Sequence, residues 1–191
     1  MNDRYTLSLA RADECHELYT LVRRVWTLMD NKDLFAVENL TEEAFAAYLS
    51  PRGFCVAART EEGELAGVLA CCYPGPDEDN LGHDLGYTQE QLMRVCLMDI
   101  GAVAPEHRGH RLEQQMLLFA ENCLAGTPYV HLLCSVSPHN PASLHSVQKC
   151  GYQIMLTKMK YEGHLRHILL KERAAAEDAA PGIPDGSAGA C

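Results

Sequence analysis

The chain has 191 residues, of which 47% are hydrophobic, and its formal net charge is −10. This length suits one domain with a substantial core, and the acidic balance argues against broad nucleic-acid binding. No apolar run approaches the ~18 residues that a membrane span needs, and no signal-peptide pattern opens the chain.

The nine cysteines indicate a reducing compartment. Most of them lie inside apolar segments such as FCVAA and LACCY, their number is odd, and no CxxC pair occurs. Free cysteine in such segments behaves as a small hydrophobic residue. The sequence therefore predicts a cytoplasmic protein without structural disulfides.

The first part of the chain predicts a strand, two helices and a hairpin. Apolar residues between positions 12 and 29 recur every three or four residues, which is typical of an amphipathic helix. Thr41, followed by two glutamates, is a good N-cap for a second helix that ends before Pro51. The expected strands are 5–10, 53–60 and 64–73, and the last two turn at Glu62-Gly63.

The middle of the chain predicts a long loop, a short helix and a central strand. Residues 74–87 are rich in acids, glycine and proline, and a loop of that length is usually functional or disordered. Thr88 and Gln91 have the spacing of a capping box. Strand 95–103 is apolar except for Asp99, which suits a strand buried on both faces.

The rest of the chain completes an α+β domain. A basic turn at 104–111 leads into a helix that starts at Leu112 and stops at Gly126. A further helix starts at Asn140-Pro141, and strands are expected at 129–136, 152–161 and 165–171. Residues 1–173 form a single domain in this interpretation, and residues 174–191 form a disordered tail rich in alanine, glycine and proline.

The turn before Leu112 has the properties of an anion site. The first amides of a helix have no internal partner and lie at the positive end of its dipole. Arg108, His110 and Arg111 lie on this turn, and no Ser, Thr, Asp or Asn is placed to cap the helix. The pattern predicts a site for a phosphate or pyrophosphate.

Two motifs resemble the GNAT superfamily of acyl-CoA N-acyltransferases. The segment VAPEHRGHRLE at 103–113 resembles its acyl-CoA signature, R/Q-x-x-G-x-G/A after a V-x-P. The segment NPASLHSVQKCGY at 140–152 resembles its N-x-x-S…K-x-G-F/Y block, and TKMKYEGHLRHILLKE is similar to the closing strands of one branch. The signature glycines fall at Arg111 and Glu113, which is a departure, because a carboxylate there repels an anion.

The resemblance implies a fold and an activity. The implied fold is a central mixed, mostly antiparallel sheet of about seven strands with helices on both faces. Its fourth and fifth strands splay to admit the pantetheine arm of CoA. The implied activity is direct transfer of an acetyl group from acetyl-CoA to a primary amine, with both substrates bound. The departure at the two glycines keeps an alternative open, namely a catalytically inactive acyl-CoA sensor or interaction module.

Asp99 is the expected catalytic base. It lies four residues before Val103, so strand alternation would put both side chains on one face, and an apolar strand would raise its pKa. The alternative is a structural Asp99, hydrogen-bonded to a loop or an arginine. No general acid is assigned, since the stretch HSVQ lacks a tyrosine; His145, Ser146, Cys150 or water are alternatives, with Tyr152 and Tyr161 weaker ones.

The resemblance also implies the acyl-CoA contacts. The backbone of one strand end would pair with pantetheine, the turn would hold the pyrophosphate, and the N-x-x-S block would meet the pantetheine, although Asn140 is equally a helix cap. These residues are Gly101, Ala102, Val103, Arg108, Gly109, His110, Arg111, Leu112, Asn140 and Ser143.

Metal and partner expectations are simple. The pairs His107 with His110 and His139 with His145 offer too few ligands at too wide a spacing, so no metal is expected. The acceptor is a small-molecule or peptide amine that meets the N-terminal helices and the 74–87 loop, whose acidity favours a cation. A homodimer is left open, and neither nucleic acid nor a membrane is expected.

Overall fold

The structure is a computed structural model that describes residues 4–174, so the predicted disordered tail lies outside the described residues apart from residue 174. Seven strands form one sheet in the order β1-β2-β3-β4-β5-β7-β6. Neighbours pair antiparallel except β4 and β5, which are parallel. The strands are β1 Tyr5–Leu9, β2 Gly53–Thr60, β3 Leu65–Cys72, β4 Val95–Val103, β5 His131–Val136, β6 Gln153–Lys160 and β7 His164–Glu172.

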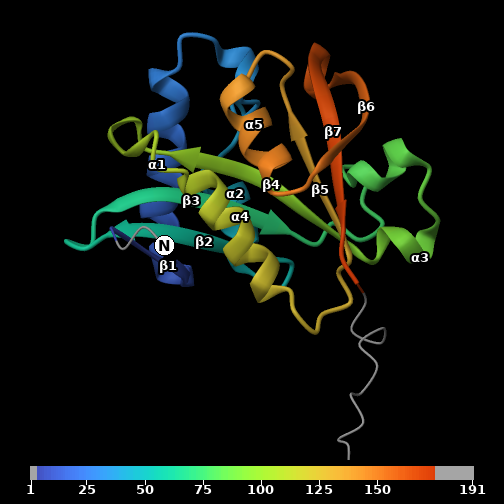
Figure 1. Ribbon diagram of the computed structural model, residues 1–191, viewed down its shortest axis with the longest axis horizontal. Helices are drawn as coiled ribbons and strands as arrows, with labels where there is room; N and C mark the ends of the chain where they lie inside the picture. The colour runs from blue at the N-terminus through green and yellow to red at the C-terminus, as the bar shows by residue number, and fades with distance from the viewer. Residues whose placement is uncertain (1–3, 175–191) are drawn as a thin grey trace, which may run out of the picture.

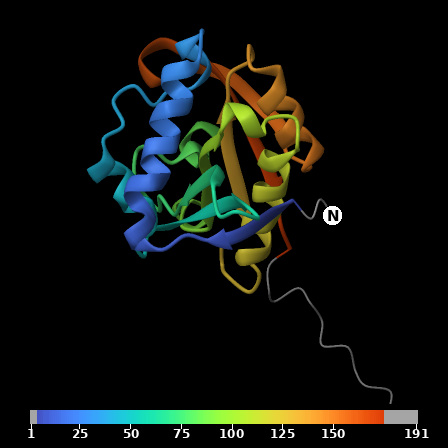
Figure 2. The same ribbon diagram turned by 90° about the vertical axis from the view of Figure 1, so that its left-hand side faces the viewer.

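Helices cover both faces of the sheet. Figure 2 shows α1 on one side and α4 and α5 on the other. Each layer buries its own core, one formed with α1 and α2 and the other with α4 and α5. The α-helices are α1 Cys15–Leu28, α2 Glu42–Ala46, α3 Gln89–Leu92, α4 Leu112–Cys123 and α5 Pro141–Lys149. The predicted fold, a mixed seven-stranded α+β sheet with helices on both faces, is confirmed.

β4 and β5 pair only at their first residues. The register runs from Val95 opposite His131 to Leu97 opposite Leu133 and then stops, although both strands continue. In Figure 1 the two arrows diverge beyond this point, with α5 lying near the opening. The predicted splay of strands four and five is therefore confirmed, and the far half of β4 faces a gap on this side.

Local sequence signals account for the helix starts. The Thr41 hydroxyl accepts a hydrogen bond from the amide of Ala44 at 3.1 Å. Thr88 and Gln91 form the expected capping box before α3. Each cap satisfies amides that a helix start leaves without partners.

The acidic segment 74–87 is ordered around Asn80. Its fully buried side chain donates to the carbonyl oxygens of Gly75 and Leu92 and accepts from the amide of Gly82. A short 3₁₀ helix, η4 Leu81–Leu85, follows this residue. The segment is therefore an ordered part of the fold beside the sheet.

The described cysteines are free thiols, mostly inside the two cores. Within residues 4–174 no helix combines the length and the apolar character that crossing a bilayer requires.

Two neighbouring leucines of α4 provide a stability test. Leu117 is 2% exposed and Leu118 is 48% exposed. Leu117→Ala should lower the free energy of unfolding by about 2–5 kcal/mol, because it leaves a cavity in the core. Leu118→Ala should change it by less than about 0.5 kcal/mol. Urea denaturation of both variants measures the difference, and equal losses would contradict the packing of α4.

Candidate active site

The gap between β4 and β5 opens into a cleft of about 920 Å³. Its walls come from the far half of β4, the end of β5, the turn before α4 with the first part of α4, the start of α5, and the end of α1 with the segment that follows it. Because β5 no longer pairs with β4 here, the main chain of Gly101 to Val103 has β3 on one side and the cleft on the other. An extended ligand could add to this strand edge.

The pairing of β3 with β4 contains an irregularity at Asp99. Ala70 is opposite Ile100, but Cys71 is opposite Met98, so Asp99 is an extra residue on β4. Such a bulge interrupts the alternation of side chains between the two faces. The expectation that Asp99 shares a face with Val103 because four residues separate them is therefore wrong.

The bulge directs Asp99 toward Tyr48. The Tyr48 hydroxyl donates a short hydrogen bond to the Asp99 carboxylate, and the Tyr48 ring packs against the core beneath α1 and α2. The Asp99 side chain is exposed, but it faces the interior of the cleft and not an open surface, which limits its solvation. This loss of solvation raises the pKa of Asp99, while the hydrogen bond from Tyr48 acts to lower it.

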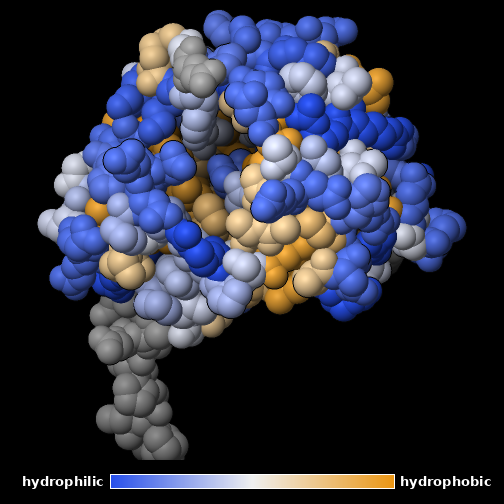
Figure 3. All heavy atoms as spheres, turned by 180° about the vertical axis from the view of Figure 1, so that it is seen from behind, coloured by the Kyte–Doolittle hydropathy of each residue, from blue (hydrophilic) through white to orange (hydrophobic). Residues whose placement is uncertain are grey.

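A second cavity of about 540 Å³ meets the cleft at Asp99 and Ser135, which line both. Viewed from behind, the surface is hollowed, with apolar residues inside the hollow and hydrophilic residues around its rim (Figure 3). Carboxylates outnumber guanidinium groups among the lining residues of this second cavity. The acids are Glu38, Asp77, Asp79 and Asp99, and the arginines are Arg52 and Arg166.

Tyr161 lines the second cavity and reaches the cleft only through its contact with Ser135, which lines both. Its hydroxyl is 3.1 Å from the hydroxyl of Ser135 on β5. Burial raises the pKa of Tyr161 to about 12, so the phenol keeps its proton at neutral pH. The other tyrosine considered, Tyr152, is 2% exposed in the core beneath α4 and does not line the cleft.

The turn before α4 has the backbone of a glycine-rich loop with only one glycine. Gly109 has φ of 83° and Arg111 has φ of 58°, which is the left-handed region. Arg111 holds the position of the first signature glycine, so the chain keeps the backbone conformation while changing the residue. No side chain caps α4. In the described structure, neither Arg108 nor Arg111 uses its exposed guanidinium in an ion pair or hydrogen bond.

Glu113 bridges α4 and α5 inside the cleft. The Ser143 hydroxyl donates a hydrogen bond of 2.6 Å to its carboxylate. Burial raises the pKa of Glu113, although this hydrogen bond acts in the opposite direction. A carboxylate that holds a proton more readily repels an anionic ligand less.

The structure brings the predicted site residues together with one exception. Asp99, Gly101, Ala102, Val103, Arg108, Gly109, Arg111, Leu112, Asn140 and Ser143 all line the cleft. The exception is His110, whose ring lies near the carbonyl oxygen of His107 and the guanidinium of Arg4, outside the lining. The Asn140 side chain caps α5 by accepting from the amide of Ser143 at 3.2 Å.

Sequence reasoning missed Tyr48 and Ser135. Tyr48 follows α2 and meets Asp99 only through the tertiary fold, so no spacing could reveal it. Ser135 has a sequence signal in hindsight, since it is the polar residue in the apolar strand HLLCSV.

Comparisons with known proteins agree with this geometry. No family model and no curated protein matches the chain. Solved structures do match, among them a GNAT-family acetyltransferase from Streptococcus pneumoniae with a TM-score of 0.67 and 17% identity, covering 89% of this chain and 99% of that one. A GCN5-related N-acetyltransferase from Kribbella flavida has a TM-score of 0.65 at 13% identity, covering 91% and 100%.

A third solved structure contains ligands. The aminoglycoside acetyltransferase AAC(6')-Ib, in complex with ribostamycin and coenzyme A, has a TM-score of 0.65 at 16% identity. The match covers 93% of this chain and 98% of that one. The chain therefore has the GNAT fold.

The left-handed residue at the turn predicts an unusual response to substitution. Both Arg111→Gly and Arg111→Ala remove the guanidinium, but only glycine adopts a φ of 58° without strain. Arg111→Gly should therefore be more stable than Arg111→Ala by about 0.5–1 kcal/mol. The same pair of substitutions at exposed Leu118, inside α4, should show the reverse order by about 1 kcal/mol. Urea denaturation of the four variants measures both differences, and the same order at both positions would contradict the backbone conformation of the turn.

Proposed function

We propose that this chain, with its GNAT fold, is an acyl-CoA-dependent N-acyltransferase that moves acetyl from acetyl-CoA to a primary amine. The observation that carries the proposal is the combination found in one cleft. An open strand edge at Gly101 to Val103 continues into a turn with uncapped helix amides and two unpaired arginines. The edge suits the amide groups of pantetheine, and the turn suits the linked phosphates.

Asp99 is the base in this proposal. An amine attacks the thioester carbonyl only as the free base, and with a pKa of ~10.4 roughly one lysine-like amine in 2,500 is neutral at pH 7. Asp99 lies where the two cavities meet, so it can accept the amine proton directly or through a water. Its raised pKa makes it a stronger base than a solvated aspartate.

Tyr161 and Ser135 are candidates to return a proton. When the new C–N bond forms and the C–S bond breaks, CoA leaves as a thiolate, whose negative charge needs a proton or a hydrogen-bond donor. The Ser135 hydroxyl, which lines the cleft, and the Tyr161 hydroxyl form a hydrogen-bonded pair that could relay a proton to the sulfur, and the proton that Asp99 took from the amine replaces it. The reaction then needs both substrates bound together and no covalent enzyme intermediate.

The acceptor in this proposal is a cationic amine. It would enter the second cavity, whose lining has four carboxylates and only two guanidinium groups. Opposite charge in a cleft attracts such a substrate and raises its association rate. An aminoglycoside, like the ribostamycin bound by the AAC(6')-Ib structure, is one molecule of this class, and polyamines and lysine amines are others.

Glu113 favours the main alternative, an acyl-CoA sensor without turnover. Its carboxylate lies in the cleft at a position where the signature has a small residue, and it occupies the Ser143 hydroxyl. Calorimetry with acetyl-CoA and CoA, followed by a thiol-release assay with polyamine, aminoglycoside and lysine-peptide acceptors, separates the cases. Binding with turnover supports the enzyme, binding without turnover supports the sensor, and no binding at millimolar ligand rejects both.

Substitution of Asp99 tests its role. Asp99→Asn keeps the size of the side chain but cannot accept the amine proton, so kcat should fall by about 10²–10⁴-fold at neutral pH. The dissociation constant for acetyl-CoA should stay within about twofold, because the substituted side chain lies away from the turn that binds the phosphates. Steady-state kinetics and calorimetry provide the two values. Unchanged turnover would remove Asp99 from the mechanism.

The pH dependence of turnover tests the contact between Tyr48 and Asp99. The hydrogen bond from Tyr48 stabilises the ionised carboxylate and so lowers the pKa of Asp99. Tyr48→Phe removes this effect and should raise that pKa. Since the base works only when ionised, the acidic limb of kcat against pH should move to higher pH in Tyr48→Phe. A profile that keeps its acidic limb in place would show that another group sets it.

A further inference from the structure

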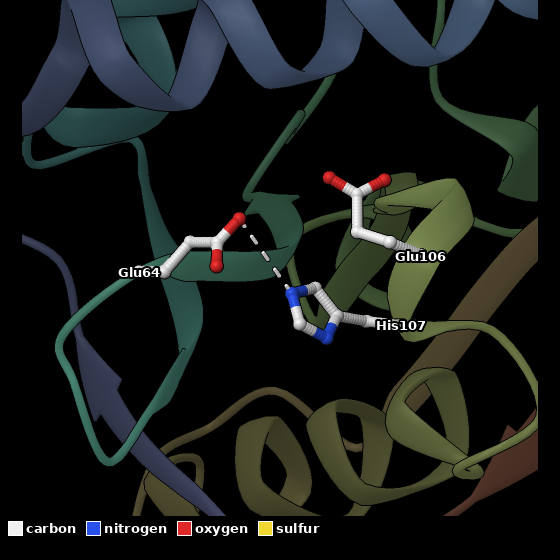
Figure 4. A group of neighbouring side chains, drawn as sticks. All are labelled: Glu64, Glu106 and His107. Carbon is white, nitrogen blue, oxygen red and sulfur yellow. Dashed lines mark ion pairs between the residues drawn. The ribbon is translucent and has the colours of Figure 1, made fainter.

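We propose that Glu64, Glu106 and His107 form a binding site for a divalent transition-metal ion, with Zn²⁺ the best match. Their ligand atoms all lie within 4.8 Å of one another. Figure 4 shows the imidazole and the Glu64 carboxylate directed toward each other, while the Glu106 carboxylate lies beside them and points toward α1, where it pairs with Arg24. Glu64 directly precedes β3, while Glu106 and His107 belong to the 3₁₀ helix η5 Pro105–His107.

The strongest indication of a ligand is the buried imidazole of His107. It is only 7% exposed, and its Nε2 atom is buried with no hydrogen-bond partner in the described structure. A buried polar atom without a hydrogen-bond partner destabilises a fold, so such an atom calls for an explanation. Nε2 lies 3.8 Å from a carboxylate oxygen of Glu64, which is too far for a hydrogen bond. A cation between the two groups would satisfy both.

Tyr5 holds the imidazole in a suitable orientation. Its hydroxyl is 3.1 Å from Nδ1 of His107, and the two rings meet edge to face. When Nδ1 donates to this hydroxyl, Nε2 has no proton and presents a lone pair toward Glu64. Histidines that bind metals usually hold their second ring nitrogen in a hydrogen bond of this kind. β1 thus supplies the support and η5 the ligand.

The charges around the cluster suit a divalent ion. Glu64 and Glu106 bring two carboxylates to the cluster, and Arg24 faces one of them. Arg24 contacts one Glu106 oxygen at 2.7 Å, and both side chains are partly solvent-exposed. An incoming ion can therefore take the second oxygen or displace the arginine. The exposed Glu64 can move to close the remaining distance.

The donor set selects the metal. Zn²⁺ takes both imidazole nitrogen and carboxylate oxygen as ligands, and three protein ligands leave a fourth position for water. Mg²⁺ and Ca²⁺ prefer sites made only of oxygen. The absence of a metal was expected from the histidine pairs alone, whereas Glu64 reaches this site from the hairpin of β2 and β3, far from His107 in the sequence.

The position of the site gives the ion a structural role. Arg108, the first basic residue of the anion-binding turn, directly follows His107. An ion joining Glu64 to η5 would hold the base of that turn against the start of β3. This role does not depend on transfer activity, so the site can be tested apart from the proposed function.

The test is a metal titration of the full chain after dialysis against EDTA. Calorimetry with ZnCl₂ should give one site with a micromolar or tighter dissociation constant, and the melting temperature should rise with Zn²⁺ but not with Mg²⁺. Glu64→Gln should weaken Zn²⁺ binding at least tenfold and abolish the rise. Glu61→Gln, which changes an exposed glutamate of the same hairpin turn outside the cluster, is the matched control and should bind like the unchanged chain.

Two further measurements separate this site from zinc bound by cysteine thiolates and from a folding defect in the variants. Co²⁺ bound through one imidazole and carboxylates gives weak visible bands without the strong near-ultraviolet band of a thiolate ligand, so such a band would place the ion on the cysteines and overturn the proposal. Circular dichroism of both variants in EDTA must show an intact fold. No Zn²⁺ binding at millimolar concentration, or equal binding by both variants, would also overturn it. If only pH changes the melting temperature, a proton rather than a metal joins His107 to Glu64.

Discussion

The end of hydrogen bonding between β4 and β5 is the constraint on which the site depends. Beyond Leu97 and Leu133 the two strands separate, and each keeps a partner only on its other side. An unpaired strand edge is normally a liability that proteins cover. Here the edge forms one wall of a cleft that β5, α4, α5 and the end of α1 enclose, so the backbone groups are open to a ligand of limited width. The divergence exposes the strand edge at Gly101 to Val103, and the turn before α4 lies at the end of that edge.

The two departures from the glycine signature have different physical meanings. Arg111 keeps the left-handed backbone that glycine would adopt, so the turn retains its shape and carries an added charge. Glu113 alters the chemistry of the cleft itself, because its side chain reaches Ser143 across the space between α4 and α5. The first change is compatible with anion binding and the second works against it, unless the carboxyl is protonated. The choice between enzyme and sensor therefore rests more on Glu113 than on Arg111.

Sequence reasoning succeeded where local rules decide the structure. Caps at Thr41, Thr88 and Asn140 are set by residues within three positions, and the apolar periodicity marked the strands and long helices closely. It failed where one residue changes a long-range register. The bulge at Asp99 depends on how β3 and β4 pair, and the contact with Tyr48 depends on how α2 packs against the sheet. Neither the bulge nor this contact is visible in the spacing of nearby residues. The sequence therefore predicts that Asp99 lies on the central strand, but it does not predict that Tyr48 is its partner.

The divergence of the strands also affects how the molecule fluctuates. The sheet consists of two strongly paired blocks, β1 to β4 and β5 with β7 and β6, and their direct strand contact spans only three residue pairs. A block joined to the rest by so short a ladder can open locally without global unfolding. A ligand lying along β4 and touching β5 would add contacts between the two blocks and hold them together. Occupancy of the cleft would then slow amide exchange across the whole outer block, including β6, which lies two strands away from the gap.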